Sequence, residues 1–117
     1  MLFIQYPKCS TCKKVRAWLA EHGVPFEDRH IVEQNPTAEE LADWHGRSGL
    51  PLKRFFNTSG LLYKSMNLKD RLPDMPEVEQ LRLLAADGML VKRPIVVDGE
   101  TVLVGFKPDE WEAALLK

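Results

Sequence analysis

Two cysteines, Cys9 and Cys12, are the only ones in this chain of 117 residues, and two residues separate them. Cys9 stands at the predicted start of a helix, where unpaired backbone N–H groups and the helix dipole stabilise an anion. Such a position lowers the pKa of a thiol, and the thiolate is the nucleophilic form. Cys12 follows one turn later, so its sulfur can resolve a mixed disulfide on Cys9. The spacing predicts a redox pair, with Cys9 as the nucleophile, Cys12 as the resolving thiol, and a reversible disulfide between them.

Two other interpretations of the cysteine pair remain open at this point. The cysteines could be small buried apolar residues, although Lys8, Lys13 and Lys14 surround them with positive charge, which favours a thiolate. They could also be half of a zinc site, but a structural zinc ion needs four ligands. The three histidines, at 22, 30 and 45, show no ligand spacing, and His22 lies on an apolar helical stripe as a core residue would. We therefore predict redox chemistry and no metal.

The elements that must position this pair follow from hydrophobic periodicity and from turn residues. Strands are predicted at 2–6, 26–32, 94–97 and 101–104, and helices at 10–22, 36–49, 51–56, 61–72, 76–88 and from 107 onward. Thr37 and Glu40 form a capping box, and Asp98-Gly99 predicts a hairpin turn. In the helix at 76–88, Val78, Leu81, Leu84 and Ala85 are predicted to face inward and Gly88 to end the helix. This order predicts one α/β domain over 1–117 with a helical insertion at about 36–88.

Composition limits the classes of partner. The formal net charge is −1, with 16 basic and 17 acidic residues, so no whole-chain electrostatic signal for nucleic acid exists. The apolar runs are too short to span a membrane, and residues 1–25 lack the order of a signal peptide. Two cysteines do not form a secreted disulfide framework. We expect a cytoplasmic monomer that contacts neither a membrane nor nucleic acid directly.

Three motifs carry a resemblance to a known family: YPKCSTCKK at 6–14, KRPIVV at 92–97 and VGFK at 104–107. Together they resemble the ArsC/Spx family, which comprises glutaredoxin-type arsenate reductases and Spx/MgsR redox regulators. The resemblance covers essentially the whole chain. It implies a thioredoxin-like fold with a helical insertion, and it implies that Pro94 is the cis-proline packed beside the redox motif.

The resemblance also implies roles for individual residues. Cys9 matches the reactive cysteine of the family, and Cys12 matches the second cysteine of the Spx-like CxxC motif. Arg93 matches an arginine that holds the oxyanion in the arsenate reductases. Asn57 and Lys107 stand where those enzymes have two further arginines. Loss of the fixed guanidinium fork at both positions weakens the expected capture of an oxyanion.

The resemblance leads to one main functional expectation and two alternatives. The main expectation is an arsenate-reductase-like thiol-disulfide oxidoreductase that acts on a small thiol or a protein disulfide. It would hold no bound cofactor and would be reduced by glutathione, glutaredoxin or another low-molecular-weight thiol. The first alternative is an Spx-like redox sensor that binds the C-terminal domain of the RNA polymerase α-subunit. The second is a true glutaredoxin-dependent arsenate reductase.

Overall fold

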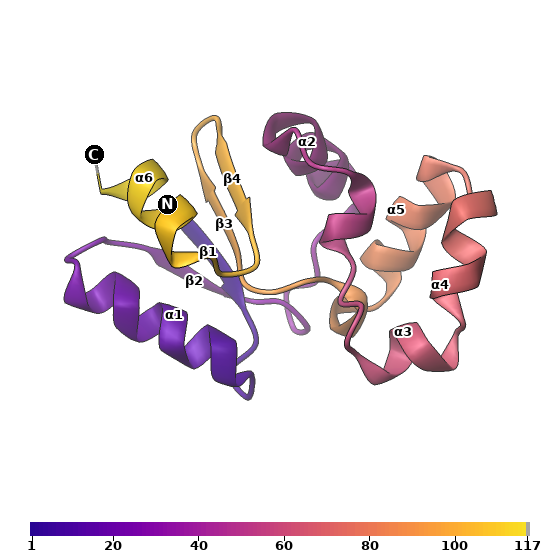
Figure 1. The fold of residues 1–117 in the computed structure, drawn as a ribbon, viewed down its shortest axis with the longest axis horizontal. Coiled ribbons are helices and arrows are strands. Elements are labelled where there is room, and N and C mark those ends of the chain that lie inside the picture. Colours follow the sequence, from indigo (N-terminus) through magenta and orange to yellow (C-terminus); the bar gives the residue numbers. More distant parts are fainter. Residues whose placement is uncertain (117) are drawn as a thin grey trace.

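The computed structural model describes residues 1–116 and divides them into a sheet half and a helical block (Figure 1). The sheet half contains β1 (Leu2–Gln5), α1 (Ser10–Glu21), β2 (Glu27–His30), β3 (Ile95–Asp98), β4 (Thr101–Val104) and α6 (Pro108–Leu115). The helical block lies between β2 and β3 and contains α2 (Ala38–Ser48), η1 (Leu52–Phe55), α3 (Leu61–Ser65), α4 (Leu68–Arg71), η2 (Leu72–Asp74), α5 (Glu77–Ala86) and η3 (Gly88–Leu90). None of the described helices is long and apolar enough to cross a membrane.

The four strands form one sheet in the order β2-β1-β3-β4. β1 pairs with β2 in parallel, whereas the β1–β3 and β3–β4 pairs are antiparallel. Asp98 pairs with Thr101, which leaves Gly99 and Glu100 as the loop of a two-residue hairpin, with Gly99 at a φ of +58°. Such a turn requires positive φ, which explains the glycine. The arrangement confirms the thioredoxin-like fold with helices inserted between its two halves.

The two faces of the sheet bury different clusters, because successive side chains on a strand point to opposite faces. Phe3 and Val96 pack on one face with side chains of α1 and α6, including the fully buried Trp111. Ile4 and Ile95 pack on the other face against the helical block. Figure 1 shows α1 and α6 on one side of the strands and α2 to α5 on the other.

Helix α1 begins directly after the Cys9 backbone. Cys9 is the N-cap residue, with extended φ and ψ of −84° and 124°, and its N–H donates to the carbonyl of Tyr6 at 3.0 Å. The helix ends before Gly23, which has a φ of +65° that a glycine adopts without strain. The loop from β1 into α1 therefore places the Cys9 sulfur at the helix N-terminus, as the sequence predicts.

The helical block is joined to the sheet half by a short backbone pairing. Phe56 forms a β-bridge with Val91, the N–H of Asn57 donates to the carbonyl of Leu90 at 2.7 Å, and the N–H of Lys92 donates to the carbonyl of Phe55 at 2.8 Å. This pairing sets the position of the residues on either side of it. Asn57 and Arg93, 36 positions apart in sequence, thereby come to one place in the fold.

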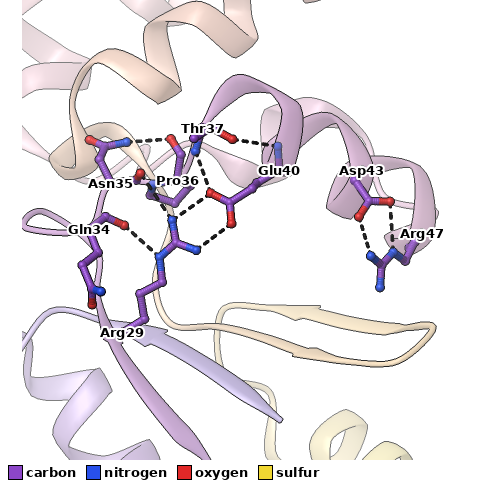
Figure 2. A network of polar contacts seen from close by, with 8 residues as sticks. All are labelled: Arg29, Gln34, Asn35, Pro36, Thr37, Glu40, Asp43 and Arg47. Carbon is purple, nitrogen blue, oxygen red and sulfur yellow. Dashed lines mark hydrogen bonds and ion pairs between the residues drawn. The ribbon is translucent and has the colours of Figure 1, made fainter.

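A second joint connects edge strand β2 to α2 through Arg29 (Figure 2). Its guanidinium binds both carboxylate oxygens of Glu40, at 2.6 and 2.8 Å, and its Nε donates to the carbonyl of Gln34 at 2.9 Å. Glu40 also completes the predicted capping box, because Thr37 and Glu40 exchange hydrogen bonds of 3.0 Å. One carboxylate therefore caps α2 and holds that helix to the sheet.

Three local predictions are wrong. Val78 does not face inward: it is 56% exposed on the first turn of α5, whose buried residue is Leu84. Gly88 does not cap α5, which ends at Ala86; it begins η3, where a Cβ would collide with the carbonyl oxygen of Ile31. His22 is exposed rather than in the core, and its Nδ1 lies 2.8 Å from the carbonyl oxygen of Trp18 at the end of α1.

The Arg29–Glu40 pair predicts a pH-dependent contribution to stability. The hydrogen bonds from Arg29 lower the pKa of Glu40 to about 2, against the opposing effect of partial burial. A carboxylate whose pKa falls on folding stabilises the native state above its unfolded pKa, and this stabilisation is lost as the pH falls through the folded value. Because 34% of the Glu40 side chain is exposed, we expect Glu40→Gln to lower the free energy of unfolding by only about 1 kcal/mol at pH 7.

Urea unfolding at pH 7, 5 and 3 tests this, with the exposed neighbour Glu39→Gln as the matched control. The difference between the two variants should be largest at pH 7 and should shrink below pH 4. Equal stability of the two variants at pH 7, or a difference that stays constant down to pH 3, would contradict the assigned role of Glu40.

Candidate redox site

The two cysteines of the predicted pair differ sharply in their surroundings. Cys9 is partly exposed at the N-cap of α1, whereas Cys12 lies beneath it with 1% of its surface exposed. Both are free thiols in this structure. Hydrogen bonding from the thiol and the backbone N–H of Cys12 lowers the pKa of the Cys9 thiol. The thiolate of the partly exposed Cys9 is thus stabilised by the buried Cys12.

Arg93 supplies the positive charge of the site. It precedes Pro94, and the peptide bond between them is cis. Its guanidinium carbon lies 5.1 Å from the centre of the Tyr6 ring, within the range of a cation–π interaction. Its charge and its hydrogen-bonding capacity lower the pKa of the Cys9 thiol. Its Nε and Nη1 are buried and have no hydrogen-bond partner within residues 1–116.

These contacts decide the protonation state of Cys9. Partial burial raises its pKa, but the hydrogen bonds from the Cys12 backbone, the Cys12 thiol and Arg93, together with the charge of Arg93, outweigh that effect. The pKa of Cys9 is therefore lowered relative to a free thiol. Compared with a free thiol, a larger fraction of Cys9 is therefore thiolate at neutral pH, and the thiolate is the nucleophilic form.

Cys12 behaves in the opposite way. Burial raises its pKa to about 12, and the negative charge of the neighbouring Cys9 thiolate adds to this increase. Cys12 therefore stays protonated while Cys9 is ionised. The two pKa values, shifted in opposite directions, separate an attacking thiolate from a resolving thiol.

A cleft of about 660 Å³ opens beside Arg93, and we call it the Arg93 cleft. It is lined by Asn57, Ser59, Gly60, Leu61, Leu62, Met89 and Arg93. Asn57 packs closely over Gly60, where a Cβ would lie 2.8 Å from its Nδ2. Polar groups of the loop thus form one side of the cleft, and apolar side chains of α3 and η3 form another.

The structure brings some of the expected site residues together and not others. Asn57 and Arg93 share the cleft, whereas Lys107 is not among the described residues that line it. Lys107 is exposed at the N-cap of α6, with its Nζ 3.9 Å from a carboxylate oxygen of Glu110. Among the charged side chains, Arg93 lowers the Cys9 pKa. Lys13 and Lys14 are exposed on α1.

Two parts of the site were missed by the sequence reasoning. Tyr6 lies within the YPKC motif and at the end of a predicted strand. The sequence did not indicate that its ring would contact Arg93 and His30. The apolar wall combines Leu61 and Leu62 of the predicted helix at 61–72 with Met89, which follows the predicted helix at 76–88. The motif could have indicated Tyr6, but no local signal identified the wall.

We predict that Arg93, rather than the flanking lysines, controls the reactivity of Cys9. The pH midpoint of Cys9 alkylation by iodoacetamide should lie below the free-thiol value of about 8.5. Arg93→Gln should raise that midpoint, because it removes a hydrogen bond and a positive charge from the thiolate. Lys14→Gln, an exposed position on the same helix, is the control and should leave the midpoint in place. A wild-type midpoint at or above 8.5, or equal shifts in the two variants, would refute the assignment.

Comparisons with known proteins give the family to which this chain is similar. The chain matches the model of the ArsC family over residues 4–114. It is 55% identical to the uncharacterized protein YusI of Bacillus subtilis, covering 96% of this chain and 95% of that protein. It is 32% identical to the regulatory protein MgsR of the same organism, covering 94% and 86%.

A solved structure shows the same fold. The crystal structure of a Bacteroides fragilis protein, described as related to the ArsC family, is 57% identical to this chain. The two superpose with a TM-score of 0.92 over 96% of each chain. On the match to the family model and on these similarities, the chain is a member of the ArsC family.

Proposed function

We propose that this protein is a thiol-disulfide oxidoreductase that reduces a disulfide substrate through Cys9 and Cys12. The observation that carries the proposal is the opposite direction of the two pKa shifts at one helix N-terminus. A low-molecular-weight thiol such as glutathione, directly or through glutaredoxin, restores the reduced pair. The site needs no bound cofactor for this chemistry.

In the first step the Cys9 thiolate attacks one sulfur of the substrate disulfide. A bond forms between the Cys9 Sγ and that sulfur, the substrate S–S bond breaks, and the other half leaves as a thiolate. Arg93, which has stabilised the Cys9 thiolate, is close to the charge as it moves to the leaving sulfur. The product of this step is a mixed disulfide on Cys9.

In the second step Cys12 resolves the mixed disulfide. Once Cys9 is bonded to substrate it carries no negative charge, so one of the causes of the high Cys12 pKa disappears. Cys12 loses its proton and attacks the Cys9 sulfur, which releases the second substrate half as a thiolate. The protein has then given two electrons to the substrate and holds a Cys9–Cys12 disulfide. Two equivalents of the reducing thiol return it to the dithiol and leave as their own disulfide.

Arsenate is a weaker candidate substrate on the residues present. Of the three positions that the resemblance assigns to oxyanion binding, only Arg93 carries a guanidinium. Asn57 has no charge, and Lys107 lies beside Glu110. A single arginine, which also binds the Cys9 thiolate, provides fewer charge-assisted hydrogen bonds than a tetrahedral oxyanion needs for tight capture.

The proposal predicts different outcomes for substitutions of the two cysteines. With 2-hydroxyethyl disulfide as substrate and glutathione as reductant, Cys9→Ser should lower the rate at least about 100-fold, because the nucleophile is lost. Cys12→Ser should retain the first step and accumulate a mixed disulfide on Cys9. Mass spectrometry of the intact protein detects that species as one added substrate half or one added glutathione.

Ser10→Ala, a substitution within the motif that removes no thiol, is the control and should keep both steps. Turnover by Cys9→Ser equal to that of the wild type, or no mixed disulfide on Cys12→Ser, would contradict the mechanism.

In the same assay with arsenate in place of the disulfide, we expect turnover near background. Arsenate turnover faster than disulfide turnover would favour the arsenate reductase alternative.

A second candidate function rests on the similarity to MgsR, which is named a regulatory protein. In this alternative the Cys9–Cys12 pair is a redox sensor, and oxidation changes the affinity for the C-terminal domain of the RNA polymerase α-subunit. Binding of that domain, measured by calorimetry with the fully reduced and fully oxidised protein, tests it. The regulator hypothesis predicts at least tenfold tighter binding to one state, about 1.4 kcal/mol. Equal affinity or no binding in both states would exclude this partner.

A further inference from the structure

We propose that the Arg93 cleft binds the residues beside the reactive cysteine of a polypeptide substrate, and that Leu61 makes it prefer large apolar side chains there. This inference rests on the proposed oxidoreductase function and names the substrate class of the same site. It assigns to helix α3 of the helical block the role of selecting the substrate.

The first observation is the exposure of Leu61. It is 86% exposed, which makes it the most exposed large apolar side chain within residues 1–116. It begins α3 directly after the polar loop residues Ser59 and Gly60, and it lines the Arg93 cleft. Because Leu62 and Met89 line the same cleft, Leu61 is part of a contiguous apolar surface rather than an isolated exposed leucine.

The second observation is the size and lining of the cleft. Its volume of about 660 Å³ falls within the range of about 300–1,000 Å³ typical of sites for organic ligands. Leu62 and Met89, both partly buried, continue the apolar surface that Leu61 begins. Methionine adapts its shape to different partners. A tetrahedral anion at Arg93 would leave this apolar wall in water, whereas a large apolar side chain would cover it.

The third observation connects the cleft to the redox chemistry. Arg93 lines the cleft, its guanidinium carbon lies 5.1 Å from the centre of the Tyr6 ring, and the N–H of Cys9 donates to the Tyr6 carbonyl at 3.0 Å. A substrate sulfur bonded to Cys9 is therefore near Arg93 and its cleft. The Nε and Nη1 of Arg93 are buried donors without an acceptor within residues 1–116. A backbone carbonyl of a bound peptide can accept from the N–H donors of Nη2, which is not among these buried nitrogens. In Figure 1 the N-terminal end of α1 and helix α3 lie along the same, lower edge of the molecule.

These observations favour a polypeptide over a small symmetric disulfide. A small disulfide reaches Cys9 but has no group to cover Leu61. A peptide supplies both the apolar side chain and the backbone carbonyls. The chemistry is the exchange described above: the peptide's sulfur bonds to Cys9, its former partner leaves as a thiolate, and Cys12 then releases the peptide thiol.

The test uses two hexapeptides, each with one cysteine held as a mixed disulfide with 5-thio-2-nitrobenzoate. One peptide has leucine on both sides of the cysteine and the other has serine. Stopped-flow absorbance of the released thionitrobenzoate gives the second-order rate constant with each. Both constants are divided by those with free glutathione as the nucleophile, which removes intrinsic differences between the peptides. The mixed disulfide of 2-mercaptoethanol with 5-thio-2-nitrobenzoate serves as the small probe.

We expect the wild type to react about tenfold faster with the leucine peptide, the order of selectivity that an apolar contact supplies. Leu61→Ser should reduce this ratio at least threefold, a change in selectivity that a general loss of Cys9 reactivity would not produce. Val78→Ser, which replaces another exposed apolar side chain on the distant helix α5, is the matched control and should retain the ratio. Because Leu61 is exposed, its substitution should not impair folding, and circular dichroism verifies this.

Provided that the small probe reacts, two results would overturn the inference. One is a ratio of leucine-peptide to serine-peptide rate constants near one in the wild type, and the other is the same ratio in the wild type and in Leu61→Ser. Failure of the small probe to react with the wild type would instead contradict the proposed oxidoreductase function. The two failures are therefore distinguishable in one set of measurements.

Discussion

The electrostatic interaction between the Arg93 guanidinium and the Cys9 thiolate is the one on which this site depends. It supplies the charge that lowers the Cys9 pKa, and the same guanidinium lies over Tyr6 and contributes to the neighbouring cleft. Arg93 reaches this place because the backbone of 91–92 pairs with that of 55–56. The helical block is thus part of the redox site, because it provides both the pairing partner and the cleft wall.

Much of the fold could be predicted from local patterns. The capping box at Thr37 and Glu40, the Asp98-Gly99 turn and the start of α1 each rest on hydrogen bonds between residues close in sequence. The position of Cys9 at the N-terminus of α1 could be predicted for the same reason. The roles of Cys9 as nucleophile and of the buried Cys12 as resolving thiol stay predictions.

What sequence alone could not supply comes from contacts between distant segments. The placement of Asn57 beside Arg93 depends on the pairing that joins the helical block to the sheet, and no periodicity encodes it. The charge that lowers the Cys9 pKa from a distant part of the chain comes from Arg93, while the lysines of α1 are exposed. Val78 fitted an apolar stripe but is 56% exposed on the first turn of α5.

The measurement that tests the central claim most directly is the reduction potential of the Cys9–Cys12 pair, obtained by equilibration in glutathione or dithiothreitol buffers with mass-spectrometric counting of free thiols. A reversible oxidoreductase should show a single two-electron transition between about −270 and −120 mV, the range spanned by thioredoxin and DsbA. Absence of a Cys9–Cys12 disulfide under oxidising buffer would contradict the account. So would a potential below about −300 mV, which is typical of a structural disulfide.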